Sequence, residues 1–230
     1  MREIFNQIAT FCVSALPLFL AIVLHEIAHG YAALMCGDAT AKRAKRLSLN
    51  PLRHVDPVGT VIFPALLILT RAPFMFGWAK PVPVNFAALK KPKRDMALVA
   101  LAGPAMNFVL ALISSGVLAF CFKRHAFVPS GEFERFFMVF LLSNLSLMLF
   151  NLIPVLPLDG GRVLTGLLPL KAARAFAKTE RYGFPALIFL LGVLPVVSGK
   201  FGRDWDVVGM YLAGGVRFIL EWLDKLYGLV

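Results

Sequence analysis

The sequence predicts an all-α polytopic membrane protein with about five transmembrane helices and a re-entrant or extended hairpin segment. Of its 230 residues, 59% are hydrophobic and 16% are charged, whereas soluble globular domains average about 45–50% apolar and about 25% charged residues. Apolar runs long enough to cross a bilayer, for which about 20 residues suffice, recur along the chain. Composition and run length together indicate an integral membrane protein.

The first apolar run extends from Ile4 to Met35. The first three residues are a poor basic region, and the run is longer than the apolar part of a cleavable signal peptide. We therefore expect a first transmembrane helix that is retained. Within it lies the pentapeptide His25-Glu26-Ile27-Ala28-His29, which puts three ionisable side chains into apolar sequence.

This pentapeptide has the H-E-x-x-H pattern of zinc sites. Residues four apart lie on one face of a helix, so His25 and His29 can bind one ion while Glu26 stands beside them. Two neutral imidazoles and one further ligand would hold Zn²⁺ with a position open to water, and Glu26 would take a proton from that water. The alternative is a chance pattern on a helix. We disfavour it because ionisable groups in hydrocarbon are costly and usually functional.

The connection after the first helix begins at Gly37-Asp38 and is strongly basic. Its cations are Lys42, Arg43, Lys45, Arg46 and Arg53. By the positive-inside rule this side is cytoplasmic, and the metal site lies near it because His29 is close to that helix end. His54 and Asp56 could be further ligands, but a single His-x-Asp is weak evidence beside a complete motif. We predict an exposed loop there.

A shorter apolar run, Val58 to Thr70, contains Pro64 and favours a re-entrant piece over a full crossing. The proline-rich stretch 76–85 is predicted to be extended chain. A second basic connection follows at 90–94, and positive charge on both flanks indicates that the chain dips in and returns to the same side. Non-helical backbone at membrane depth must pack on protein or line a cavity, so we expect this segment beside the active site.

The next crossing spans Met96 to Phe122, and helix packing explains its Ala-Gly-Pro-Ala-Met-Asn motif at 102–107. A return crossing, Phe136 to Ile153, ends in a break rich in proline and glycine. The break lets Asp159 reach the depth of His29, where a carboxylate would complete a His₂-carboxylate site. Asp159 could instead cap the helix that follows. We favour the ligand role because the histidine pair should lie level with it.

Residues 171–181 are predicted to form a basic surface segment, and Phe184 to Ser198 and Val207 to Leu223 a last pair of crossings. The three connections placed in the cytoplasm hold 14 Lys and Arg residues, whereas the outer ones hold six, which supports this topology. The net charge of +11 is therefore a topology signal, and no nucleic-acid partner is expected. The three cysteines are scattered and predict neither a disulfide framework nor a metal site.

The chain resembles the site-2 protease family of intramembrane zinc metalloproteases in three motifs that occur in the family's order. They are His25-Glu-Ile-Ala-His29, Ala102-Gly-Pro-x-x-Asn107 and Asn151-Leu-Ile-Pro-x-x-Pro-x-Asp159-Gly-Gly. The resemblance implies one Zn²⁺ per chain held by His25, His29 and Asp159, with Glu26 as general base and Asn151 as a stabiliser of the developing oxyanion. It also implies that Gly77 to Asn85 is the family's extended hairpin and that the chain is a minimal member without a PDZ domain.

The predicted organisation is a single integral membrane metalloprotease domain over residues 1–230. The catalytic core spans about 18–165, and additional C-terminal helices occupy 183–229. The predicted function is hydrolysis of peptide bonds in transmembrane or membrane-associated substrates. We expect a bacterial-type inner membrane, with the active site near the cytoplasmic face.

The expected partners are a transmembrane protein substrate and the lipid bilayer, and no oligomeric state is predicted. Segment 77–85 could pair with substrate as an added strand, although its prolines remove donors. The alternative function is a non-catalytic metal-handling membrane protein or transporter, with an inactive protease-like chaperone as a further reading. Metal transfer predicts exchangeable ligands on several helices, whereas the sequence offers one compact set and a base.

Overall fold

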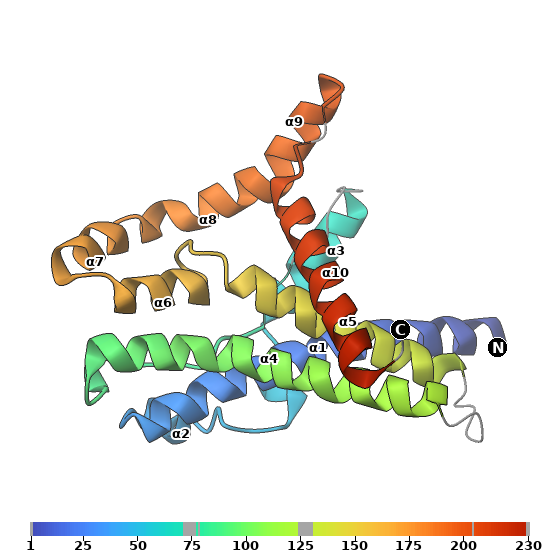
Figure 1. Cartoon of the computed structure of the whole chain (residues 1–230), viewed down its shortest axis with the longest axis horizontal. Coiled ribbons are helices and arrows are strands. Elements are labelled where there is room, and N and C mark those ends of the chain that lie inside the picture. The colour runs from blue at the N-terminus through green and yellow to red at the C-terminus, as the bar shows by residue number, and fades with distance from the viewer. Residues whose placement is uncertain (1, 71–76, 78, 124–130, 204, 229–230) are drawn as a thin grey trace.

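The computed structural model describes residues 2–70, 77, 79–123, 131–203 and 205–228, with side chains described from Ala15 onward except at 51, 64 and 68. Within these residues the chain is built from helices and contains no strand. The predicted all-α class is confirmed. The long helices α1 (Arg2–Met35), α4 (Pro92–Lys123) and α5 (Gly131–Asn151) lie alongside one another and form the central bundle (Figure 1).

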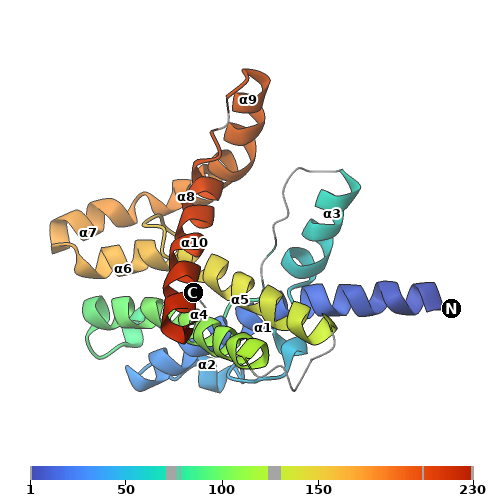
Figure 2. The same cartoon turned by 45° about the vertical axis from the view of Figure 1, so that its right-hand side comes forward.

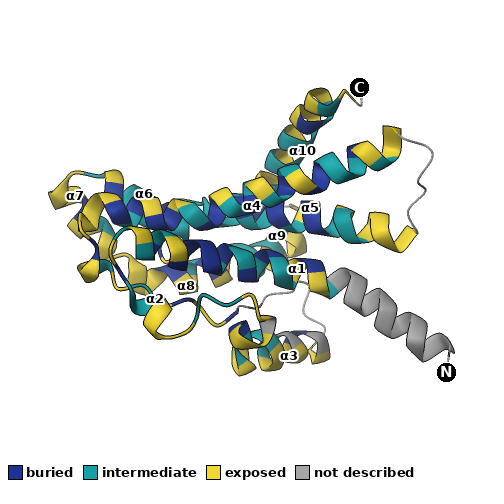
Figure 3. Ribbon diagram, turned by 90° about the horizontal axis from the view of Figure 1, so that it is seen from below, coloured by how far each residue is buried: buried dark blue, intermediate teal, exposed yellow. Residues whose placement is uncertain are grey.

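The bundle is packed through small and aliphatic side chains. Figure 3 shows the buried residues gathered on the facing sides of α1, α4 and α5. Ala21, Ala33, Ala100 and Ala111 are among the most buried residues of the chain. Small side chains let helix backbones approach closely, which is the main source of helix association where water does not drive it. One aliphatic cluster completes the packing between α4, α5 and α10, and its buried members are Ala111, Leu141, Leu145, Met148 and Leu223.

Four helical spans are long and apolar enough to cross a membrane. They are Ala15–Met35, Pro92–Lys123, Gly131–Asn151 and Glu180–Lys200. The last of these runs through α8 (Glu180–Ile188), η4 (Phe189–Val193) and α9 (Leu194–Lys200). These spans agree with the predicted membrane class, while the fifth predicted crossing, α10 (Val207–Tyr227), is not among them and stays a prediction.

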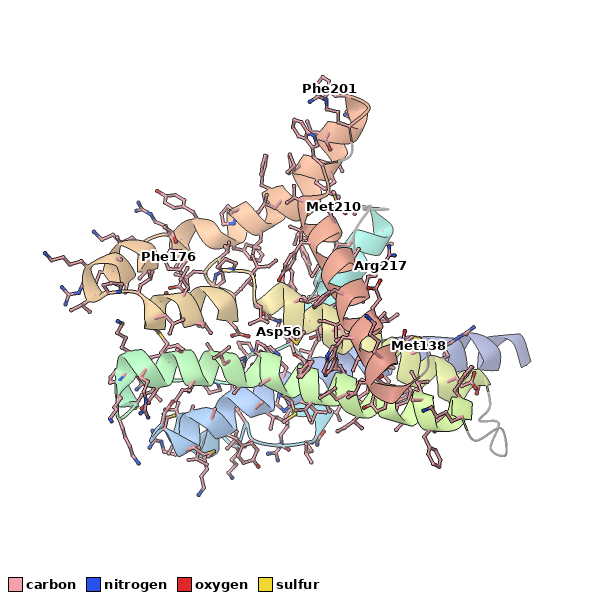
Figure 4. All side chains as sticks on the ribbon, in the orientation of Figure 1. Asp56, Met138, Phe176, Phe201, Met210 and Arg217 are labelled. Atoms are coloured by element: carbon pink, nitrogen blue, oxygen red, sulfur yellow. The ribbon has the colours of Figure 1, made fainter. Side chains whose placement is uncertain are left out.

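The C-terminal helices diverge from the bundle and then return to it. Figure 2 shows α8 and α9 leaving the bundle, and Figure 4 shows Phe201 at the tip that follows α9. From there α10 comes back to pack on α4 and α5. Its Tyr227 hydroxyl donates to the carbonyl of Leu112 on α4 at 2.9 Å. The last helix of the chain, α10, is therefore tied to the bundle.

The connection after α1 is compact. It contains α2 (Thr40–Arg43) and a short 3₁₀ turn, η1 (Pro51–His54). His54 is fully buried, and its Nε2 lies 2.8 Å from the carbonyl oxygen of Ser48. The predicted exposed loop is thus wrong for His54, because the chain folds back on itself and encloses the ring. Asp56 caps the next helical segment by accepting from the N–H groups of Val58 and Gly59 at 3.0 and 2.7 Å.

The second apolar run forms two short helical pieces, η2 (Pro57–Ile62) and α3 (Phe63–Leu69). The stretch that follows lies partly outside the described residues, which resume at 77 and 79. Residues 79–85, here called the extended stretch, form neither helix nor strand, and the backbone is extended at Asn85, where the chain leads into the 3₁₀ turn η3 (Phe86–Ala88). That both ends of this excursion lie on one side of the membrane stays a prediction.

Beyond α5 the chain breaks at 152–158 and continues as α6 (Asp159–Leu167) and α7 (Leu170–Ala177). Helix α6 lies alongside the N-terminal part of α4 (Figures 1 and 2). Gly166 makes this approach possible, because a Cβ there would lie 2.7 Å from the Cβ of Ala97 and 2.8 Å from the carbonyl oxygen of Lys93. The close packing brings the first residue of α6 to the face of the bundle.

We expect cysteines introduced at Lys45 and at Lys91 to label from the same side of the membrane, because basic residues flank the excursion between them. The measurement is reaction with an impermeant maleimide in sealed right-side-out and inverted vesicles, with the three native cysteines replaced by alanine. Arg135→Cys, near the other end of the bundle, is the control and should label from the opposite side. Labelling of positions 45 and 91 from opposite sides would show that residues 57–69 cross fully.

Candidate metal centre

Helix α1 presents His25 and His29 on one face, as the four-residue spacing predicts. Both rings are buried, with 6% and 9% of each residue exposed. Their Nε2 atoms lie 3.0 Å apart, and the rings meet edge to face with centroids 4.6 Å apart. The two nitrogens therefore point at a common place inside the bundle.

Asp159 completes the cluster from the other side of the bundle. Its Oδ2 lies 3.1 Å from His25 Nε2 and 3.2 Å from His29 Nε2. Asp159 is the first residue of α6, the N-cap position is held by Leu158, and no side chain caps that helix end. The capping alternative is thus not what the structure shows. Among the described residues these three form the one group of His, Cys, Asp or Glu side chains arranged to hold a metal ion.

A buried hydrogen-bond network determines where the imidazole protons sit. His29 Nδ1 lies 2.7 Å from the carbonyl oxygen of Val99, which can only accept, so this nitrogen carries the proton. His25 Nδ1 lies 2.5 Å from Asn107 Oδ1. The amide of Asn107 is oriented by its own donations to Ala21 O at 3.3 Å and to Asn144 Oδ1 at 2.8 Å.

Asn144 determines which way the amide of Asn107 points. Its Nδ2 donates to the carbonyl oxygen of Phe140 at 2.8 Å, which leaves its oxygen as the acceptor for Asn107. Asn107 must therefore present its oxygen to His25, and His25 is protonated on Nδ1 as well. Both asparagines are fully buried between α1, α4 and α5. In its neutral form, each histidine therefore keeps Nε2 unprotonated, which is the form that binds metal ions.

The three converging atoms are all electron-pair donors. With both rings neutral, neither Nε2 carries a proton to share, and Asp159 Oδ2 is buried without a hydrogen-bond donor. Three such atoms about 3 Å apart repel one another unless a cation lies between them. Zinc binds imidazole nitrogen and carboxylate oxygen at about 2.0–2.2 Å, so separations of 3.0–3.2 Å suit ligands of one ion. The donor set and its geometry fit zinc.

Gly103 and Asn107 belong to this centre, although helix packing was predicted to explain their motif. A Cβ at Gly103 would lie 2.5 Å from His25 Cε1 and 2.6 Å from His25 Nε2, and closer still to His29 Nε2. Only a residue without a side chain leaves the two rings room there. The signal in the sequence was the spacing, because residues 103 and 107 are four apart and share one face of α4.

Glu26 lies next to His25 on α1 and is outside the group of three side chains that could hold a metal ion. Its Oε2 accepts a hydrogen bond from the backbone N–H of Val82 at 2.8 Å. The extended stretch 79–85 therefore lies beside the metal centre, as predicted. It touches the centre through backbone, and residue types in the sequence do not reveal such a contact.

The connection after α1 holds this extended stretch at two further points. On one side of Val82, the backbone N–H of Lys80 donates to the carbonyl oxygen of His54 at 2.8 Å. The carbonyl oxygen of Lys80 accepts from Arg46 Nη2 at 2.6 Å. On the other side, the Asn85 N–H donates to Asp38 Oδ2 at 2.7 Å. These three hydrogen bonds, at Lys80 and at Asn85, hold the stretch on both sides of Val82 and so fix the Val82 N–H against Glu26.

Asp38 is charged in this arrangement. Burial would raise the pKa of its carboxyl, but hydrogen bonds from Thr40 and Asn85 outweigh burial and hold that pKa below its usual range. A carboxylate with full charge makes a stronger hydrogen bond to a backbone N–H than a neutral acceptor does. Asp38 is therefore a firm anchor for Asn85.

Asn151 does not meet the ligands. It is the last residue of α5, and its Nδ2 donates to the carbonyl oxygen of Leu147 one turn earlier at 3.0 Å. No hydrogen bond among the described residues joins its side chain to His25, His29 or Asp159. Its role in stabilising an oxyanion stays a prediction.

Comparison with known proteins agrees with the motifs. The profile of "Peptidase family M50" matches residues 122–194. "Putative zinc metalloprotease YwhC" of Bacillus subtilis (strain 168) is 40% identical over 188 residues, which cover 80% of this chain and 81% of that protein. "Putative zinc metalloprotease Rip2" of Mycolicibacterium smegmatis is 31% identical over 215 residues, covering 88% and 79%.

A more distant relative is "Zinc metalloprotease MJ0392" of Methanocaldococcus jannaschii, 28% identical over 74% of this chain and 38% of that protein. No solved structure matches. The similarity to the Bacillus and Mycolicibacterium proteins extends over most of each chain. The chain therefore belongs to peptidase family M50, the site-2 protease family that its three motifs predict.

Proposed function

We propose that this chain is an intramembrane zinc metalloprotease that hydrolyses peptide bonds of transmembrane or membrane-associated proteins. His25, His29 and Asp159 would hold the zinc, and Glu26 would be the general base. One observation carries the proposal: two imidazole nitrogens and one carboxylate oxygen meet within 3.0–3.2 Å of one another inside an apolar bundle, with a further carboxylate one residue away on the first helix. The names of the curated relatives support the same class of enzyme.

The chain's own residues prepare the centre for this chemistry. Val99 and Asn107 hold the two rings in the metal-binding tautomer. Zinc in such a centre polarises a carbonyl and makes water acidic enough to attack near neutral pH. Glu26 Oε2 accepts from Val82, and its other oxygen is free of protein donors among the described contacts. That oxygen can take a proton from the attacking water and pass it to the leaving amine.

The extended stretch offers a substrate only a short place to pair. Between residues 80 and 85, the N–H groups of Lys80, Val82 and Asn85 are already bonded, and positions 81 and 83 are prolines without N–H groups. Val84 supplies the remaining donor. We infer that a substrate strand contacts this stretch at Val84 and at backbone carbonyls, and that the stretch serves mainly to hold Glu26.

The basic connections support a cytoplasmic position for the centre in a bacterial-type cell membrane. Metal handling without catalysis is the alternative function. A transfer site needs ligands that exchange, whereas His25 and His29 are each held by a second buried hydrogen bond. Glu26, anchored beside the ligands, has no task in binding alone. Both features favour the protease.

Glu26→Gln should abolish turnover without loss of zinc, because Gln keeps the shape and the Val82 contact but cannot accept a proton. Hydrolysis should fall by about 10²–10⁴-fold, the usual worth of general acid–base catalysis. The measurement is cleavage of a panel of labelled single-span membrane proteins, with zinc content determined on the same samples. Loss of zinc would make Glu26 a ligand, and a wild-type rate would place the base elsewhere.

Gly103→Ala should lower zinc content well below one ion per chain, because the added methyl occupies the space of both imidazoles. Gly214→Ala is the matched control, since nothing lies within 4 Å of a Cβ at that helical position. In each case the change from glycine to alanine favours the helix by about 1 kcal/mol. A difference in zinc content between the two variants therefore reports the effect of the added methyl group at the metal centre. Helix content by circular dichroism checks folding, and full zinc occupancy in folded Gly103→Ala would contradict this geometry.

Asp38→Asn and Arg46→Gln should each lower turnover by about 10–100-fold. This is the usual loss of activity on mutation of residues that orient a metal site without binding the metal. Zinc should be retained, because neither residue touches the ligands. The reason is that each change frees one side of the stretch that carries Val82. Lys42→Gln, on the exposed face of α2, is the control. Wild-type turnover in both variants would show that Glu26 needs no such support.

A further inference from the structure

A groove runs between the first turns of α4 and the side of α6. Its volume is about 610 Å³. The walls are apolar and are formed by Ala97, Leu98, Leu101, Val163 and Leu167. Leu98, Leu101 and Leu167 are 48%, 40% and 72% exposed, so the groove is open to whatever surrounds the helices. In a membrane protein those surroundings are lipid.

The mouth of the groove is basic. Lys91, Lys93 and Arg94 line it and are all exposed. The nearby Asp95 is 2% exposed and is turned inward, where it accepts from the Lys91 N–H at 2.8 Å and from Arg94 Nε at 3.1 Å. Neither lysine ammonium has an ion-pair partner within the described part of the chain. Figure 4 shows nitrogen-tipped side chains gathered at this end of the molecule.

The order of charge and apolar surface along α4 matches the depth profile of a bilayer. The membrane-spanning helix α4 begins at Pro92 and has 32 residues, so at about 48 Å it is longer than the hydrocarbon core of about 30 Å, and its basic first turn fits the polar boundary. Residues 97–101 lie about 7–13 Å further along the helix, toward the hydrocarbon region. A ligand that complements both parts has an anionic head and an apolar tail. The charges lie together at one end, so the head must carry the negative charge.

We propose that this groove binds one anionic diacyl phospholipid from the surrounding bilayer. The phosphate lies against Lys91, Lys93 and the first turn of α4, whose positive dipole end favours an anion. An acyl chain lies between Leu98 and Leu101 on one side and Val163 and Leu167 on the other.

The groove lies between α4 and α6, so a lipid bound there affects the packing around the metal centre. Helix α6 begins with Asp159 and lines the groove with Val163 and Leu167, which are four and eight residues further along the same face. Helix α4 lines it a few residues before Gly103. A lipid that bridges these two helices therefore supports the packing that brings Asp159 to the histidines. The binding itself does not depend on the proposed hydrolysis.

The test is retention of lipid by the purified full chain, measured by native mass spectrometry after reconstitution with phosphatidylglycerol or phosphatidylcholine of identical acyl chains. We expect one phosphatidylglycerol per chain and selective loss of phosphatidylcholine. Lys91→Gln combined with Lys93→Gln should weaken phosphatidylglycerol retention by about 25–30-fold, at roughly fivefold per charge. Leu98→Trp should weaken it too, with every charge intact, because the indole fills the groove.

Lys171→Gln combined with Arg174→Gln is the matched control, since it removes two exposed charges from α7 at the same end of the molecule. Equal weakening by the control, or equal retention of the two lipids, would mean unspecific attraction and would overturn the proposal. Displacement of phosphatidylglycerol by soluble glycerol phosphate would show that the acyl chain does not contribute to binding. Binding of oleate as strongly as phosphatidylglycerol would show that the groove does not select a phospholipid. Zinc content of each sample separates a lost lipid site from a damaged metal centre.

Discussion

The fold depends on one chain of buried hydrogen bonds that runs from the Phe140 carbonyl through Asn144 and Asn107 to His25. Each amide has one orientation because its donors meet carbonyl oxygens. The last link places a proton on His25 Nδ1, and the Val99 carbonyl does the same for His29, so that the neutral rings offer Nε2 to a metal ion. In an apolar bundle an unsatisfied polar group costs several kcal/mol, so the network cannot rearrange cheaply. The three helices that supply these groups are thereby held in one register.

This constraint explains why the surrounding residues are small or apolar. A bundle that keeps two imidazoles, two amides and a carboxylate inside must bring helix backbones close, and Gly103 and Gly166 allow that at the two places where α4 meets the ligands and α6. The broken segment 152–158 then delivers Asp159 at the start of α6. The centre is therefore a product of helix packing, and it includes the close contact between α4 and α6 that the proposed lipid would bridge.

Sequence reasoning could find the residues whose types are unusual for their surroundings. His25, Glu26 and His29 stand out because they are ionisable in apolar sequence, and Asp159 stands out because it follows a helix break. The helical class and the extended stretch at 79–85 follow from composition and prolines. Asn151 was named from resemblance alone, and the structure leaves its amide on its own helix.

The remaining features could not be read from residue types because they are long-range or made by backbone. Val82 reaches Glu26 through an N–H group shared by every residue except proline, and it lies 56 positions away. Asp38 and Arg46 look like ordinary surface charges in the sequence, and His54 like an exposed loop residue. Gly103 looks like a packing glycine until both rings are seen against it.

The coordination of zinc tests this account most directly. Zinc K-edge X-ray absorption of the purified, metal-loaded chain should show two imidazole nitrogens and carboxylate or water oxygen at about 2.0–2.2 Å, with no sulfur near 2.3 Å. Asp159→Ala should alter that first shell or lose the metal. A sulfur ligand, a third imidazole, or a spectrum unchanged by Asp159→Ala would contradict the centre described above.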